Sequence, residues 1–130
     1  MQNGSTFIQG EVGLGFRFDG VDEFVNIPNA SHLNDTTATL SFWVKTTQTG
    51  ENIGLIAKHD QGGSTHGFTI RLICQGHVGI QIKNNDIFFA TVLNSNSAIN
   101  DAQFHPLASI CQSAGTSPLY VYGVAGQPGL

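Results

Sequence analysis

Short apolar runs separated by polar, glycine-containing turns dominate this chain of 130 residues. Apolar and polar residues alternate along most of these runs, which is the pattern of a strand with one buried face. The clearest case is ATLSFWVKT at residues 38–46, where Leu40, Phe42 and Val44 share one face. Eight or nine such runs follow one another at roughly ten-residue spacing, and no helical periodicity exceeds one turn. The pattern predicts an all-β protein built as an antiparallel β-sandwich.

A hairpin is predicted near the start of the chain. Its strands would cover residues 15–19 and 23–27 and meet at the turn Asp19-Gly20-Val21-Asp22. The turn is plausible because glycine adopts the positive φ that tight turns require. Further strands are predicted at residues 53–58, 67–74, 77–83, 87–93, 108–111 and 119–122, with an edge strand at residues 6–9.

Composition narrows the function classes. Charged residues make up 11% of the chain and 16 residues are glycine, which favours strands and turns over solvent-exposed helices. The net charge of −4 and the scattered five Lys and Arg residues argue against a nucleic-acid surface. No apolar run approaches the roughly 20 residues of a membrane span. We expect one domain over residues 1–130, with a lead-in at 1–10 and a tail at 124–130.

The two cysteines leave two alternatives open. Cys74 and Cys111 could form one disulfide or remain two buried thiols, since two cysteines are too few for a disulfide framework. The first residues contain no basic segment followed by an apolar one, so no signal peptide is predicted.

Several motifs, in order, resemble the laminin G-like branch of the concanavalin A-like lectin/glucanase jelly rolls. They are FDG at residues 18–20, TLSFWVKT at 39–46, GLIAKHD at 54–60, HGFTIRL at 66–72, INDAQFHPLA at 99–108 and LYVYG at 119–123. The resemblance implies a jelly-roll sandwich located outside the cell or at its surface. It also implies a non-catalytic, lectin-like module that binds a glycan or a glycoprotein surface.

The chain departs from that family pattern in three places. Phe104 stands where the family usually has Trp, and Pro106 follows His105, which removes one backbone donor from the strand. Tyr122 replaces the usual Asp of the late hairpin. Few residues follow Gly123, so closing strands of the jelly roll are expected to be missing. Open strand edges would then favour a homo-oligomer, a dimer or larger, and the alternative function is a structural, assembling protein without a small ligand.

Three carboxylates surround the predicted turn and form the candidate metal site: Asp19, Asp22 and Glu23. Calcium takes six to eight oxygen ligands, and the resemblance implies that such an ion is common in relatives. The alternative is that the Asp side chains bond their own backbone and shape the turn. No histidine or cysteine spacing supports zinc.

A catalytic role is not predicted. Glycoside hydrolysis needs two carboxyl groups that face the sugar, and none of Glu11, Glu23 or Glu51 has a second acid two or four residues along its strand. Asp22 and Glu23 are adjacent and would point to opposite faces. A degraded glycosidase relative remains a third hypothesis.

Binding residues are predicted in loops and turns that are rich in polar and aromatic residues. Aromatic rings can stack on sugar faces while amides, acids and imidazoles bond hydroxyl groups. Trp43 and Phe42 are instead expected in the core, as neighbours on a strand covered on both faces. The predicted ligand-binding residues are Tyr122, His59, Asp60, His66 and Asn96.

Overall fold

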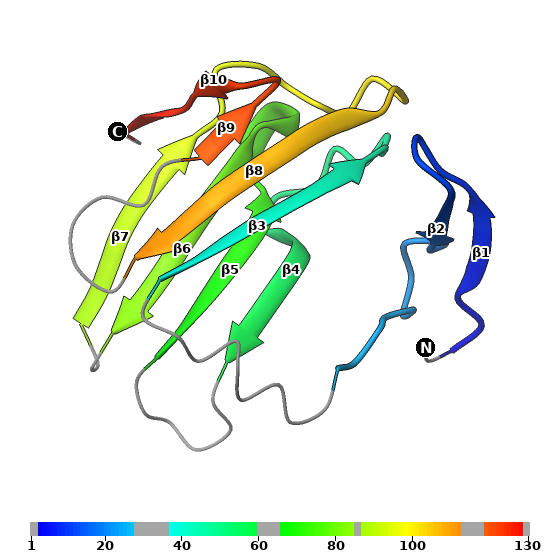
Figure 1. Ribbon diagram of the computed structural model, residues 1–130, viewed down its shortest axis with the longest axis horizontal. Helices are drawn as coiled ribbons and strands as arrows, with labels where there is room; N and C mark the ends of the chain where they lie inside the picture. Colours follow the sequence, from blue (N-terminus) through cyan, green and yellow to red (C-terminus); the bar gives the residue numbers. More distant parts are fainter. Residues whose placement is uncertain (1–2, 28–36, 60–65, 85–86, 113–118, 129–130) are drawn as a thin grey trace. The chain divides into compact units, whose positions relative to one another are not determined.

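The computed structural model describes residues 3–27, 37–59, 66–84, 87–112 and 119–128 (Figure 1). Residue contacts divide the chain into two units, Met1–Asn34 and Asp35–Leu130. Within the described residues, no helix is long and apolar enough to cross a membrane.

The first unit contains one antiparallel hairpin, formed by β1 (Thr6–Gln9) and β2 (Leu14–Arg17). Phe7 pairs with Phe16, and their ring centroids lie 5.2 Å apart. The connection is closed by a hydrogen bond of 2.9 Å from the Gly10 amide to the Gly13 carbonyl, and Gly13 has a φ of 66°. Glycine tolerates this conformation because it has no Cβ.

The hairpin predicted over residues 15–27 is therefore wrong. Residues 14–17 pair with the preceding segment, and the only bridge in the second predicted strand is a single one at Phe24. Local side-chain bonds explain the difference, because Asp19 and Glu23 both accept hydrogen bonds from backbone amides of this bend. Such bonds compete with a strand ladder. The edge strand predicted at residues 6–9 is confirmed.

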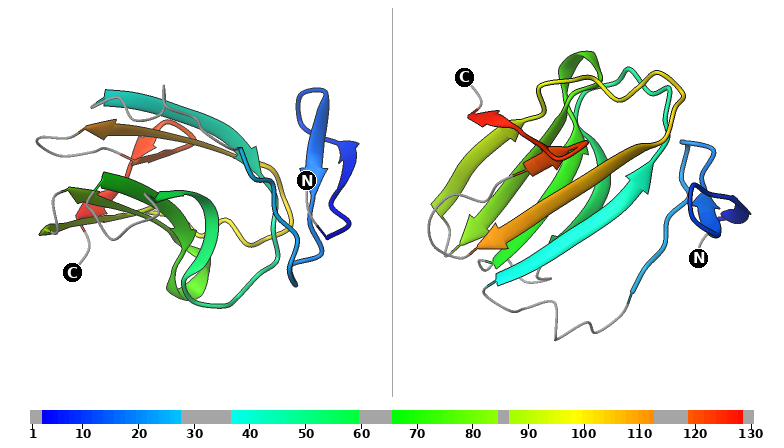
Figure 2. Two further views of the ribbon diagram at one scale, coloured as in Figure 1. Left: turned by 90° about the horizontal axis from the view of Figure 1, so that it is seen from below. Right: turned by 45° about the horizontal axis from the view of Figure 1, so that its top comes forward.

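The second unit is a sandwich of two antiparallel sheets, seen as two layers in Figure 2 (left). The four-stranded sheet has the order β10-β9-β8-β3, and the five-stranded sheet the order β11-β7-β6-β5-β4. Their bounds are β3 Thr37–Val44, β4 Ile53–His59, β5 His66–Leu72, β6 Val78–Asn84, β7 Ile87–Asn94, β8 His105–Gln112, β9 Leu119–Val121, β10 Val124–Ala125 and β11 Gln127–Pro128, with a short 3-10 turn η2 at Cys74–Gly76. The all-β, antiparallel prediction is confirmed.

The core lies between the two sheets and follows the predicted alternation. Leu107 and Val121 come from the four-stranded sheet, and Ile99 from the loop before β8. The five-stranded sheet contributes the largest share, with Ile70, Leu72, Val78 and Ile80 all fully buried. Burying one such side chain contributes roughly 1.5–3 kcal/mol, so this cluster is the main source of stability in the unit.

Trp43 is not a core residue, which corrects the prediction. Leu40, Phe42 and Val44 pack against the core, whereas Trp43 is 45% exposed. Adjacent residues of a strand point to opposite faces, and only one face of β3 is covered by the second sheet. Phe42 lies on the covered face, so its predicted core position is confirmed.

Three further predictions change. Strand β8 already begins at His105, ahead of the predicted start at residue 108. The predicted tail contains two short strands, since β10 pairs with β9 and β11 pairs with β7. Cys74 is a free, exposed thiol, so neither a disulfide nor a buried thiol describes it; the side chain of Cys111 lies outside the described residues.

Candidate functional site

The tight turn between β9 and β10 presents Tyr122 in an unusual backbone conformation. Val121 pairs with Val124, which leaves Tyr122 and Gly123 as the turn, with φ values of 52° and 74°. Two successive residues at positive φ define the type I′ turn that joins twisted strands, where Asn, Asp and Gly are preferred. A side chain with a Cβ costs roughly 1–2 kcal/mol in this region. Local backbone preference therefore does not explain a tyrosine here.

Three contacts hold Tyr122 in place. Its amide donates to the Pro106 carbonyl at 3.2 Å, and its hydroxyl donates to the Phe104 carbonyl at 3.3 Å. Its ring meets the imidazole of His105 edge-on, with centroids 5.1 Å apart. The residue nevertheless remains 55% exposed, so Tyr122 is held in place and accessible at the same time.

His105 is itself oriented by Asp101. The His105 side chain is only 5% exposed, and its Nε2 lies 2.7 Å from Asp101 Oδ1. Because a carboxylate only accepts, Nε2 carries the proton, and the buried Nδ1 has no partner within the described residues. This hydrogen bond, followed by one from the Gln103 amide, lowers the pKa of Asp101. The pair thus gives His105 one defined orientation beneath Tyr122.

The outer face of the four-stranded sheet carries more exposed aromatic surface beside this turn. Trp43 on β3 pairs in register with Pro106 on β8. The ammonium group of Lys45 lies 5.4 Å from the centroid of the Phe104 ring, within the range of a cation–π contact. Trp43 and Lys45 are two residues apart and therefore share this face.

Asn96, a predicted ligand residue, is partly engaged in the fold. Its amide nitrogen donates to the Ala125 carbonyl at 2.8 Å, which ties the loop after β7 to β10. The residue is exposed, and its amide oxygen makes no hydrogen bond within the described part of the chain. Ala125 belongs to β10, the strand that follows the Tyr122 turn, so Asn96 contacts the same hairpin that contains Tyr122.

The backbones of His59 and His66, two further predicted ligand residues, lie away from Tyr122. His59 ends β4 and His66 begins β5, and Figure 1 shows the end of β4 at the opposite end of the sandwich from the end of β9. Their side chains, and Asp60 entirely, lie outside the described residues. The predicted site thus separates into at least two places.

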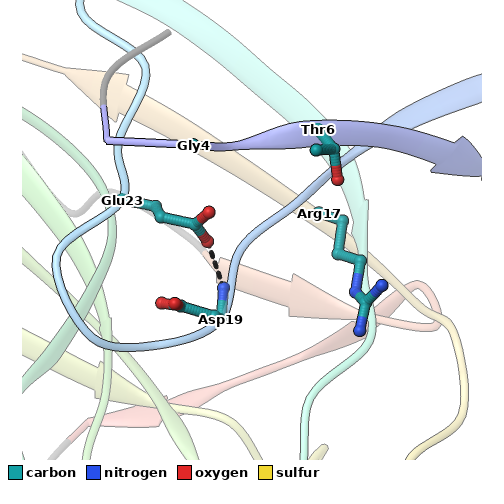
Figure 3. A pocket seen from close by; sticks show the side chains of 5 residues that line it. All are labelled: Gly4, Thr6, Arg17, Asp19 and Glu23. Atoms are coloured by element: carbon teal, nitrogen blue, oxygen red, sulfur yellow. Dashed lines mark hydrogen bonds between the residues drawn. The ribbon is translucent and has the colours of Figure 1, made fainter.

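The acidic bend of the first unit is stabilised by its own side chains (Figure 3). Asp19 Oδ1 accepts the Val21 amide at 2.8 Å, which confirms the turn-shaping alternative for this residue, and Glu23 accepts the Asp19 amide. Asp22 contributes its backbone carbonyl, which accepts the side-chain amide of Asn3 at 2.9 Å.

A hollow of about 230 Å³ adjoins this bend. It is lined by Gly4, Thr6, Arg17, Asp19 and Glu23. The Arg17 guanidinium shares the hollow with the two carboxylates and would repel a cation there. No three His, Cys, Asp or Glu residues group as metal ligands in the described ranges, and the calcium site stays a prediction.

Sequence reasoning missed two features of the Tyr122 region. It placed Trp43 in the core, and it did not predict the pairing of Asp101 with His105. The signal for Trp43 was available, because it alternates with three apolar residues along β3. The Asp101–His105 pairing had no comparable signal, since a separation of four residues in a loop and a strand start has no fixed geometry.

The fold and this surface define a class: a two-sheet antiparallel β-sandwich with polar and aromatic groups at the end of one sheet. A laminin G-type family model, described as the concanavalin A-like lectin/glucanases superfamily, matches residues 19–127, and the chain belongs to this family. Domains of this type are generally non-catalytic binding modules. Neither the curated proteins nor the solved structures contain a match to the chain.

Proposed function

We propose that the chain is a non-catalytic, lectin-like module that binds glycans or glycoprotein surfaces. The observation that carries the proposal is Tyr122, an exposed ring kept at positive φ by three contacts. A residue held in a costly conformation is a reason to look for a function at that residue. Membership in a family of binding modules supports the same proposal. On the resemblance alone, the cell surface or the extracellular space remains the predicted location.

The chemistry of the turn suits a sugar. A pyranose ring has an apolar C–H face and a rim of hydroxyl groups. An aromatic side chain offers a flat apolar surface on which the C–H face can stack. The Asp101 carboxylate, 58% exposed, is next to the His105 ring that supports Tyr122 and can accept hydrogen bonds from hydroxyl groups. The Asp101 carboxylate thus provides a hydrogen-bond acceptor near the Tyr122 ring.

The placement of the acids supports binding without catalysis. Asp19 and Glu23 accept backbone amides, and Asp101 pairs with His105. Glycoside hydrolysis needs a pair of carboxyl groups on either side of the scissile bond, and no such pair occurs at Tyr122 within the described residues.

A glycan array followed by calorimetry tests the proposal on the 130-residue protein. We expect the wild type to bind at least one glycan class, and Tyr122→Ala to bind it about tenfold more weakly, a loss of about 1.4 kcal/mol. Val124→Ala, an exposed change beside the same turn, is the control and should bind normally. Absence of any glycan binding would contradict the proposal. Repeating the titration with EDTA tests the predicted calcium site at Asp19, Asp22 and Glu23.

A second candidate is assembly through open sheet edges. β3 and β4 are the outer strands of their sheets, and neither has a second partner strand in the described part of the chain. Unpaired backbone groups along an edge invite another chain to add a strand. Light scattering tests this candidate: a dimer or larger species supports it, and a folded monomer at high concentration contradicts it.

A further inference from the structure

We propose that β4, the edge strand of the five-stranded sheet, binds an extended acidic segment of another protein. The added strand would pair with the free edge of β4 and place one Asp or Glu side chain beyond Gly54, where Arg71 binds its carboxylate. This surface belongs to the other sheet from Tyr122 and is independent of the proposed glycan site. It gives one of the open edges of the second candidate function a specific occupant.

Arg71 lies on the outer face of the five-stranded sheet. Its neighbours Ile70 and Leu72 are fully buried between the two sheets. Adjacent residues of a strand point to opposite faces, so the Arg71 side chain points away from the core. The residue is only partly exposed, and it makes no hydrogen bond or ion pair within the described residues. A guanidinium carries five donors and binds a carboxylate through two parallel hydrogen bonds, so Arg71 is suited to an acidic partner.

Glycines flank Arg71 on both neighbouring strands. In the register of the sheet, Arg71 pairs with Gly54 on β4 and with Gly79 on β6. A Cβ at Gly54 would have no atom within 4 Å, so the place that a side chain would take there is empty. A carboxylate can therefore approach the guanidinium from the β4 side, over Gly54.

The edge of β4 is open to a further strand. β4 ends the order β11-β7-β6-β5-β4 and has no second partner in the described part of the chain. A strand added there would lie roughly 10 Å from β5, which is two strand spacings. A long acidic side chain can meet Arg71 across this separation, because Gly54 leaves the space between them free. The bulge between Gly54 and Ile56 interrupts the ladder and disfavours indiscriminate pairing, so the carboxylate would select the partner and its register.

A second copy of the chain does not supply the carboxylate. The described strands that have an open edge are β1, β2, β3, β4, β10 and β11, and none of them contains Asp or Glu. Pairing between such edges of two copies would leave Arg71 without a partner. The occupant is therefore an acidic strand of another protein. Backbone hydrogen bonds would supply its affinity and one acidic side chain its specificity.

Fluorescence anisotropy with labelled eight-residue peptides tests the edge on the 130-residue protein. The peptides alternate Thr and Val and differ at one central Thr, which is replaced by Glu, Gln or Lys. They are titrated with wild type, Arg71→Met, Arg71→Glu and Gly54→Val. Arg17→Met removes the same charged group from the first unit and is the matched control. Circular dichroism of every variant checks that it is folded.

We expect wild type to bind the Glu peptide about tenfold more tightly than the Gln peptide. Arg71→Met should lose this preference, and Arg17→Met should retain it. Gly54→Val should weaken binding of the Glu peptide, because its side chain fills the empty place beside Arg71. Arg71→Glu should prefer the Lys peptide, and an exchange of preference cannot arise from a folding defect.

Absence of peptide binding, or equal binding of the three peptides to wild type, would overturn the acidic-strand site. Glutarate that binds at Arg71 as tightly as the Glu peptide would show an anion site without strand addition and would also overturn it. A dimer in light scattering that binds no peptide would assign the edge to a second copy. Glycan binding that depends on Tyr122 and not on Arg71 would leave the proposed function standing in all three cases.

Discussion

Two tight bends of this protein, one in each unit, are built on opposite principles. The bend at Asp19 contains the residues that such a bend prefers, and its own side chains accept its backbone amides. The turn at Tyr122 contains a residue that its backbone disfavours, and its stability depends on Pro106, Phe104 and His105, which are distant in sequence. The first bend is explained by local structure. The second requires tertiary contacts, and for that reason it is the stronger candidate for a function.

The two units also differ in what is buried. Among the residues whose burial the structure describes, the sandwich encloses seven buried apolar residues, whereas the hairpin exposes Phe7 and Phe16 by 54% and 50%. A two-stranded hairpin is marginally stable by itself in water. Substitutions of buried residues in the sandwich should therefore lower the free energy of unfolding far more than substitutions in the hairpin.

Ile80→Ala is expected to have the largest effect on stability. Ile80 is fully buried, and replacing a buried isoleucine by alanine lowers the free energy of unfolding by roughly 2–5 kcal/mol. Phe16→Ala, at a half-exposed position of the hairpin, should cost about 1 kcal/mol or less. Urea denaturation followed by circular dichroism measures both. Equal losses for the two variants would mean that the units do not differ in this way.

Tyr122→Asn separates the stability of the turn from its function. Asparagine relieves roughly 1–2 kcal/mol of backbone cost, which offsets the lost aromatic contact of about 0.5–1.5 kcal/mol. The free energy of unfolding should therefore change little, while glycan affinity falls about tenfold. Thermal unfolding and calorimetry on the same samples check this. A loss of stability above about 2 kcal/mol would show that Tyr122 is mainly structural.

Asp19→Ala tests the self-supported bend. The variant removes the acceptor of the Val21 amide, and one hydrogen bond contributes about 0.5–1.5 kcal/mol. We expect faster hydrogen exchange at Val21 with little change in the melting of the sandwich. Asp22→Ala is the control, because its side chain makes no hydrogen bond within the described residues. A global destabilisation would instead indicate that this bend supports the whole protein.

Asp101→Asn should have the smallest effect, confined to acid pH. The hydrogen bond from His105 lowers the pKa of Asp101 in the folded protein, so the pair stabilises the fold above the unfolded-state pKa. That contribution is lost as pH falls through the lower, folded-state pKa. Melting temperatures between pH 7 and about pH 3 should fall less steeply in the variant. Glu51→Gln, an exposed acid on another loop, serves as the control, and an identical acid slope in wild type and Asp101→Asn would refute the role of the pair.

The strands were largely predictable from sequence, and the strand pairing was not. Alternation along residues 38–46 and 67–74 identified β3 and β5 and their buried faces, because an apolar residue at every second position is the pattern of a strand with one buried face. The hairpin partner of β2 was misassigned, since Asp-Gly signals a bend without specifying what pairs across it. Short strands at Val124 and Gln127 carry too few residues for a periodic signal.

For the candidate site, the sequence alone identified the family, the all-β class and Tyr122 as an aromatic at a turn. These depend on composition, residue period and local turn chemistry, which are properties of neighbouring residues. Only the tertiary structure decided that Trp43 faces outward, that Lys45 meets Phe104, and that Asp101 orients His105 under Tyr122. Those contacts join residues from different strands, and strand register is set by how two sheets bury a shared core.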